Sequence, residues 1–186
     1  MVETEKGPFV RTPFGIALAA LALQPGATSA MAQESQPQPA CPAEAAVLPA
    51  PYAGWSQRTA MNAATDPAHL ADAQLEPGQA IDAVLASTPA VRYARRPEKP
   101  GGSVSFGGLY ALEIKTAGTY RIALGSAAWI DLLRDGEALV STAHGHGPEC
   151  TGIRKVVAFS LTPGSYLLQI SANASPRMPL LAVRVP

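Results

Sequence analysis

TAGTYRIAL occupies residues 116–124, and TPGSYLLQI occupies residues 162–170. Both stretches have the form Thr-x-Gly-Thr/Ser-Tyr followed by an alternation of apolar and other residues. Gly118 and Gly164 are expected at a positive φ in a turn, because glycine adopts that conformation without steric cost. Tyr120 and Tyr166 should then enter strands with the ring in the core and the hydroxyl near the turn, where it can bond the backbone. The echo predicts two equivalent strand entries within one sandwich.

Alternation with a period of two continues through the rest of the chain after residue 78. Tyr110, Leu112 and Ile114, for example, are separated by the shorter or polar Ala111 and Glu113. Similar runs cover residues 79–85, 130–132, 157–161 and 179–185, and Asp135-Gly136 forms a strong two-residue hairpin turn before 138–140. One-sided alternation is typical of an antiparallel sheet with one buried and one solvated face. Seven or eight strands with glycine-containing turns predict an all-β fold, an antiparallel β-sandwich or jelly roll.

One short helix is expected beside these strands. Asp66 can cap a helix whose first residue is Pro67, and the residues that follow form about two turns. We expect no other helix after residue 32.

The N-terminal residues indicate export. Lys6 and Arg11 precede an uncharged run over 14–23, which is too short to span a bilayer and suits the apolar core of a signal peptide. Ala30-Met-Ala32 provides the small residues of a cleavage site. We therefore predict a signal peptide over 1–32, a Pro/Ala-rich arm over 33–51 and a β-sandwich domain over 52–186, located in the periplasm or secreted.

Charge, hydropathy and cysteine content bear on nucleic-acid binding, on membrane insertion and on a disulfide. The chain has 14 basic and 14 acidic side chains, so its charge gives no reason to expect nucleic acid as a partner. No segment after the cleavage site is apolar and long enough to cross a membrane. In an oxidising compartment, the two cysteines Cys41 and Cys150 are expected to form a disulfide that ties the arm to the domain. The alternatives are two free thiols, or Cys150 as a metal ligand.

A dense polar cluster lies at 141–152. His144 and His146 would share one face of a strand, and with Glu149 they could form a two-His-one-carboxylate site for iron or another divalent metal. The other interpretation is a flexible, solvated loop without metal, because Gly145 and Gly147 flank the second histidine. No cofactor is expected under that interpretation.

A second cluster holds Arg92, Tyr93, Arg95 and Arg96. Guanidinium groups suit carboxylates and phosphates, and the tyrosine could stack on a sugar, so an anion or glycan site is one interpretation. A solvated loop balancing acidic residues is the other. Trp129 could likewise belong to the core or form an exposed stacking platform.

The residues from 103 to 171 resemble the secreted bacterial β-sandwich modules of the pre-peptidase C-terminal type. The resemblance rests on the repeated Gly-Thr/Ser-Tyr strands and on Trp129-Ile-Asp131 between them. Such modules are mostly appended to secreted enzymes as binding or spacer units. The resemblance implies a sandwich fold and a binding or structural role, with an envelope component or another exported protein as partner.

Small exported chains of this kind are also sometimes called homogentisate dioxygenase, which is a cupin enzyme. That similarity would imply a metal-dependent, non-haem iron dioxygenase acting on an aromatic substrate through His144, His146 and Glu149. The spacing from His146 to Glu149 is one residue shorter than the cupin pattern, and no histidine follows Pro163-Gly164. The sequence therefore favours the binding or structural protein and keeps the enzyme as its alternative.

Overall fold

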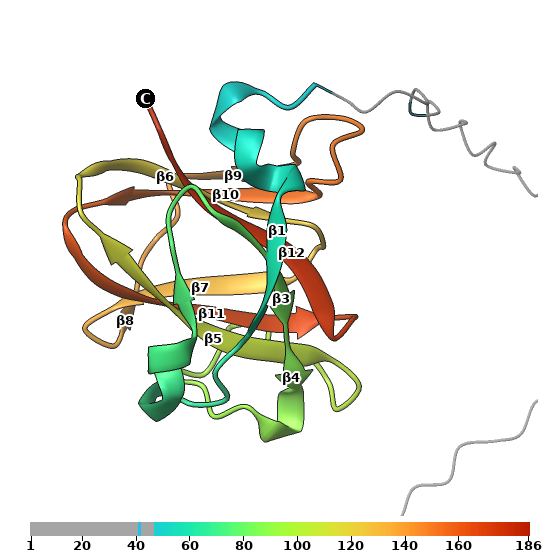
Figure 1. Cartoon of the computed structure of the whole chain (residues 1–186). Helices are drawn as coiled ribbons and strands as arrows, with labels where there is room; N and C mark the ends of the chain where they lie inside the picture. Colours follow the sequence, from blue (N-terminus) through green and yellow to red (C-terminus); the bar gives the residue numbers. More distant parts are fainter. Residues whose placement is uncertain (1–40, 42–46) are drawn as a thin grey trace, which may run out of the picture. The chain divides into compact units, whose positions relative to one another are not determined.

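Two β-sheets pack face to face in this computed structural model, which describes Cys41 and residues 47–186 (Figure 1). The signal peptide predicted at 1–32 and most of the arm predicted at 33–51 lie outside the described residues. Sheet A has the strand order β1 (Arg58–Asn62), β3 (Ala80–Val84), β12 (Arg177–Val185), β6 (Gly118–Leu124), β10 (Lys155–Leu161) and β9 (Ala143–Gly145). Sheet B has the order β2 (Gln74–Leu75), β5 (Phe106–Ile114), β11 (Gly164–Asn173), β7 (Trp129–Arg134) and β8 (Glu137–Ala138), and β4 (Ala86–Ser87) also pairs with β5.

The predicted all-β sandwich is confirmed, with more strands than the seven or eight expected. The extra strands are mostly short: β2, β4 and β8 have two residues each, and β9 has three. Two pairings, β1 with β3 and β2 with β5, are parallel. Runs this short carry too few side chains to show a period in the sequence.

The main core lies between the sheets and contains the apolar side chains that alternate along the longer strands. Leu112, Leu132 and Leu168 reach it from sheet B, and Ile122 and Leu180 reach it from sheet A. Each of these five residues is almost completely inaccessible to solvent. The period-two pattern of the sequence thus locates the interior of the sandwich correctly.

Both repeat tyrosines confirm the predicted strand entry. Tyr120 Oη donates to the carbonyl of Thr116 at 2.8 Å, and Tyr166 Oη donates to the carbonyl of Thr162 at 2.8 Å. Gly118 and Gly164 open the two strands with φ angles of 155° and 143°, in the region that favours glycine.

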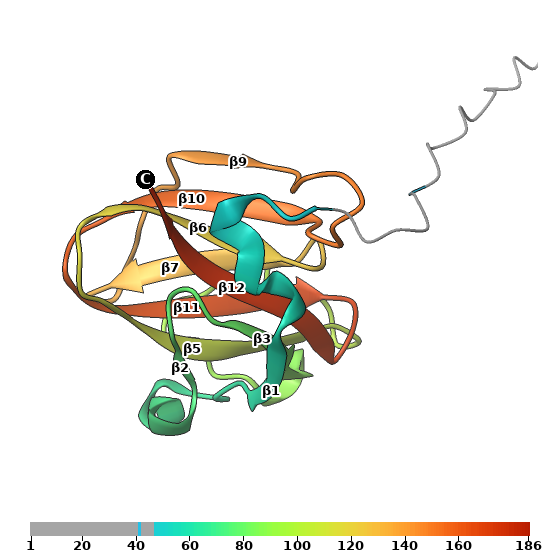
Figure 2. The same cartoon turned by 45° about the horizontal axis from the view of Figure 1, so that its top comes forward.

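The outer faces of the sheets differ from the solvated faces that the sequence predicts. Helix η1 (Ala50–Ser56) lies across β12, and its Tyr52 and Trp55 form a second apolar cluster with the outward side chains of sheet A (Figure 2). On sheet B, the segment 91–105 covers Gln169 and Ser171, which bond to the backbone of Arg95 and Lys99. These outward residues are therefore buried, because separate segments cover them.

Over residues 47–186, three short 3₁₀ helices replace the one helix expected: η1, η2 (Pro67–Asp72) and η3 (Thr88–Ala90). The predicted cap of η2 is confirmed, since Asp66 Oδ1 accepts from the amide of Ala68 at 2.9 Å. A run this short makes too few backbone bonds to sustain an α-helix, which explains the tighter geometry. Among the described residues, no helix is long and apolar enough to cross a membrane.

Candidate functional site

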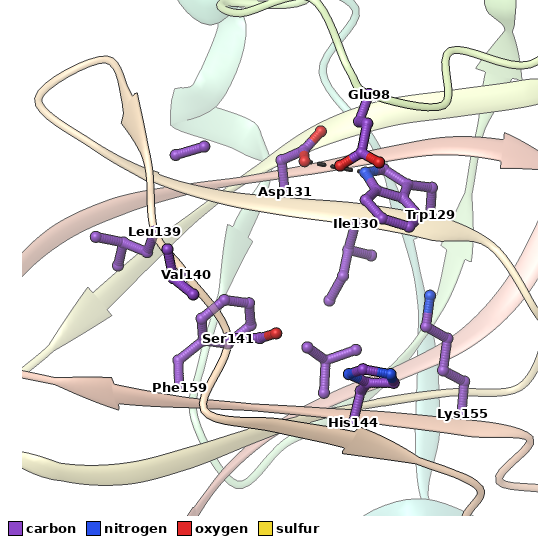
Figure 3. A pocket seen from close by; sticks show the side chains of 12 residues that line it. Glu98, Trp129, Ile130, Asp131, Leu139, Val140, Ser141, His144, Lys155 and Phe159 are labelled. Carbon is purple, nitrogen blue, oxygen red and sulfur yellow. Dashed lines mark hydrogen bonds between the residues drawn. The ribbon is translucent and has the colours of Figure 1, made fainter.

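A pocket of about 440 Å³ opens where the edges of the two sheets diverge (Figure 3). Strands β7 and β8 border it from sheet B, and β9 and β10 border it from sheet A. The chain crosses from one sheet to the other through residues 139–142, at the mouth of this lateral pocket. Its volume lies within the range of roughly 300–1,000 Å³ that is usual for ligand sites.

The lateral pocket combines an apolar floor with a polar rim. The floor is formed by Ile130, Leu139, Val157 and Phe159, and the rim carries Glu98, Asp131, Ser141, His144 and Lys155. Val140 lies at the mouth with 90% of its surface exposed, which is unusual for a large aliphatic side chain. A smaller hollow of about 220 Å³ adjoins it and shares His144 and Lys155.

Two lysines flank the half-buried Trp129. The ammonium group of Lys155 lies 5.3 Å from the centre of the indole ring and donates to the carbonyl of Ala128 at 2.9 Å. The ammonium group of Lys99 lies 5.1 Å from the same ring. In the described part of the chain, neither lysine forms a salt bridge. Burial, reinforced by the nearby charge of Lys99, lowers the pKa of Lys155.

Asp131 contributes a partly buried carboxylate to the same rim. Its Oδ1 accepts from the indole nitrogen of Trp129 at 3.0 Å. Its Oδ2 is buried and, among the described residues, has no hydrogen-bond partner within bonding geometry. Burial raises the pKa of Asp131, and the charge of Glu98 acts in the same direction.

The histidine cluster begins in a short edge strand and continues into an irregular segment. His144 lies in β9, opposite Val157 of β10, where it lines the lateral pocket. His146 follows the strand, and its Nδ1 lies 3.2 Å from the carbonyl oxygen of Arg154. Glu149 is exposed farther along. Within the described ranges, no three His, Cys, Asp or Glu side chains gather closely enough to hold a metal ion.

The segment after β9 is anchored at several points. Cys41 and Cys150 form the predicted disulfide, with their Cα atoms 5.4 Å apart. Trp55 Nε1 donates to the carbonyl of Thr151 at 3.0 Å, and Thr151 Oγ1 donates to the carbonyl of Pro148 at 2.7 Å. The predicted flexible loop is thus fastened to the arm, to η1 and to itself.

The arginine cluster is dispersed over different partners. Arg92 pairs with Asp66 at 3.1 Å, and Arg95 pairs with Glu137 at 2.6 Å. The hydroxyl of Tyr93 donates to the carbonyl of Ile170 at 3.1 Å, while Arg96 is exposed. These side chains serve mainly to hold the segment 91–105 across sheet B, and they do not converge on one point.

Sequence reasoning found His144 and named Trp129 as a possible platform, but it missed the lateral pocket. Lys99, Trp129 and Lys155 come from three separate segments, and no spacing rule brings them together. The unusually exposed Val140, next to the predicted hairpin, lies in a run that otherwise looks like an ordinary strand.

No protein-family model matches the sequence, and no curated protein matches it. Among solved structures, the chain is similar to the pre-peptidase C-terminal domain of a collagenase from Bacillus anthracis, with 16% identity and a TM-score of 0.36. That match covers 59% of this chain and 91% of the collagenase domain. A β-glucosidase from Paenibacillus barengoltzii matches with 19% identity and a TM-score of 0.25, over 67% of this chain and 13% of the β-glucosidase.

Proposed function

We propose that this chain is an exported β-sandwich module, of the general kind represented by pre-peptidase C-terminal domains, that binds a ligand in the lateral pocket. The observation that carries the proposal is an apolar cavity left open between the sheet edges, although other segments cover the outer faces of both sheets. An apolar floor with a few polar groups around it is the usual composition of a ligand site. The Cys41–Cys150 disulfide supports a periplasmic or secreted location.

The role proposed is binding, because the polar groups around the pocket lack a catalytic arrangement. Among the described residues, His69 and His146 form side-chain hydrogen bonds and His144 forms none, so no carboxylate or hydroxyl orients His144 as a general base. Asp131 is turned to the indole of Trp129. An apolar ligand group would instead gain free energy simply by leaving water for the pocket floor.

A fragment screen by ligand-observed NMR tests this function. The library should include apolar acids, amines and short peptides, and each hit should be repeated with the Val140→Asp variant, which places a charge at the pocket mouth. Val104→Asp is the matched control, because Val104 is 87% exposed and does not line the pocket. Hits that are lost with Val140→Asp and kept with Val104→Asp support the proposal. Hits that bind both variants as well as they bind the unmodified protein would overturn it.

A further inference from the structure

We propose that the ligand of the lateral pocket is the free C-terminal end of a partner polypeptide, which adds as a short strand to the open edge of β7. This inference rests on the proposed function, since it takes the lateral pocket as the binding site. Within the described part of the chain, β7 has an unpaired stretch of edge, Lys99 and Lys155 near it have no acidic partner, and the apolar pocket floor lies beside this edge.

The edge of β7 is only partly paired. Strand β8 pairs with Leu133 and Arg134, and the amide of Leu139 donates to the carbonyl of Leu132 at 2.8 Å. In an antiparallel pair, every second residue points both its N–H and its C=O toward the same neighbouring strand. Ile130 is the next such residue after Leu132, so its N–H and C=O point to the same side of β7. After Leu139 the chain continues to β9 in sheet A, and no described strand pairs with this side of Ile130. Such an unpaired edge is a template for a further strand.

The direction of the added strand brings its C-terminus to the lysines. A chain antiparallel to β7 runs toward the beginning of that strand, where Trp129 is its first residue. The ammonium group of Lys155 is bonded there to the carbonyl of Ala128, and that of Lys99 lies near the same indole. Neither ammonium group has an acidic partner among the described residues, and a terminal carboxylate beside this indole would form charge-assisted hydrogen bonds with them.

The length of the open edge favours a chain end over an internal segment. Because Leu139 already occupies the edge at Leu132, only Ile130 remains for pairing on this side. A partner can therefore pair only one residue with this edge, opposite Ile130, before its carboxylate reaches Lys155.

The lateral pocket suits an apolar side chain of that partner. A residue opposite Ile130 points to the same face of the sheet as Ile130 does, which is the face of the pocket floor. Val157 and Phe159 lie on that floor, and the exposed Val140 would cover the side chain at the mouth. Asp131 points to the other face of β7, because neighbouring residues of a strand alternate.

The test uses the exported protein and a library of random heptapeptides displayed with free C-termini. The best binder is then synthesised as the free acid, as the C-terminal amide, and with the backbone nitrogen N-methylated at the apolar residue. We expect the amide and the N-methylated peptide each to bind at least tenfold more weakly than the free acid. The amide hydrogen of Ile130 should exchange more slowly in the complex.

Variants separate the carboxylate contact from folding. Lys99→Gln combined with Lys155→Gln should bind the acid and the amide equally, because glutamine keeps a donor for Ala128 but has no charge. Lys115→Gln, a substitution of an exposed lysine elsewhere, should keep the preference for the acid. Melting curves of all variants confirm that they are folded.

The outcomes distinguish the two proposals. Equal binding of acid and amide by the unmodified protein, or unchanged exchange at Ile130, would overturn strand addition of a C-terminus. If no peptide binds while small apolar acids from the fragment screen bind in a way that Val140→Asp abolishes, the strand inference fails and the pocket still functions as a ligand site. If neither class binds there, both proposals fail.

Discussion

Tyr120 and Tyr166 make the same hydrogen bond at equivalent turns, but their surroundings differ. The hydroxyl of Tyr120 donates to the carbonyl of Thr116. The hydroxyl of Tyr166 donates to the carbonyl of Thr162 and also accepts from Arg134 Nη1 and from the amide of Thr162, each at 3.2 Å. A longer contact of 3.5 Å joins the same hydroxyl to Thr162 Oγ1, so the second tyrosine has four hydrogen-bond partners where the first has one.

Removing each hydroxyl should measure this difference. Tyr120→Phe is expected to lower the free energy of unfolding by about 1 kcal/mol, the usual net contribution of one hydrogen bond. Tyr166→Phe should cost more, because it also removes the acceptor of the Thr162 amide and one of the two acceptors of Arg134 Nη1. Urea unfolding of the two variants gives the comparison, and a smaller loss for Tyr166→Phe would contradict it.

A second prediction at this scale concerns Asp131 and pH. Its pKa is raised in the folded protein, so the ionised carboxylate opposes folding at neutral pH, and stability from this group increases as the pH falls through the folded pKa. Asp131→Asn keeps an acceptor for Trp129 and removes the charge. The variant should gain stability relative to the unmodified protein at pH 7, and the gain should shrink toward pH 3. If the two proteins differ in free energy of unfolding by the same amount at every pH, the raised pKa is refuted.

At the scale of elements, β9 is an edge strand that the sequence pattern does not predict. The strand has three exposed residues and pairs with β10 only. A Cβ added to Gly145 would meet open space, whereas one added to Gly147 would meet the side chain and carbonyl of Ile153. The two glycines look equivalent in the sequence, but only the position of Gly147 lacks room for a side chain.

A matched pair of substitutions separates them. Gly145→Ala should change the free energy of unfolding by less than about 0.5 kcal/mol, as is usual for exposed positions. Gly147→Ala should destabilise by about 1–3 kcal/mol, because the added methyl group collides with Ile153. Chemical denaturation of both variants decides the matter, and equal effects would show that the segment relaxes freely.

The long strands and their interior residues could be predicted because burial on one face gives a period of two. The turn glycines Gly118 and Gly164 and the cap at Asp66 could be predicted because each has a local conformational cause. The lateral pocket could not be predicted, since lining residues such as Glu98 and Trp129 meet only through the path of the segment 91–105 over sheet B. The covered outer faces were missed for the same reason: covering segments such as η1 have no periodic signal.

On the scale of the whole molecule, the disulfide joins positions 109 residues apart. A cross-link over so long a loop restricts the unfolded chain strongly, and the entropy model assigns it about 4–5 kcal/mol. Because both cysteines of the sequence are in this bridge, the unfolded, unreduced protein should show no reactive thiol. Cys150→Ser should unfold at a clearly lower urea concentration, and a midpoint that does not move would reject the stabilising role.

Export makes a separate prediction about the whole chain. If residues 1–32 form a signal peptide, the protein recovered from the periplasm or the medium should begin at or near Gln33. Intact-mass measurement and N-terminal sequencing check this. A product that keeps residues 1–32 and remains in the cytoplasm would remove the basis for the proposed compartment.

The central position of β12 determines when sheet A can form. This strand lies between β3 and β6, so it joins β1 and β3 to the remaining strands of the sheet. A ribosome makes Arg177–Val185 after every other strand described here, and the two parts of sheet A stay apart until then. The growing polypeptide therefore cannot close sheet A before β12 has been made. For the proposed export, a sheet that closes this late would leave the earlier strands unfolded and able to pass through a narrow translocation channel.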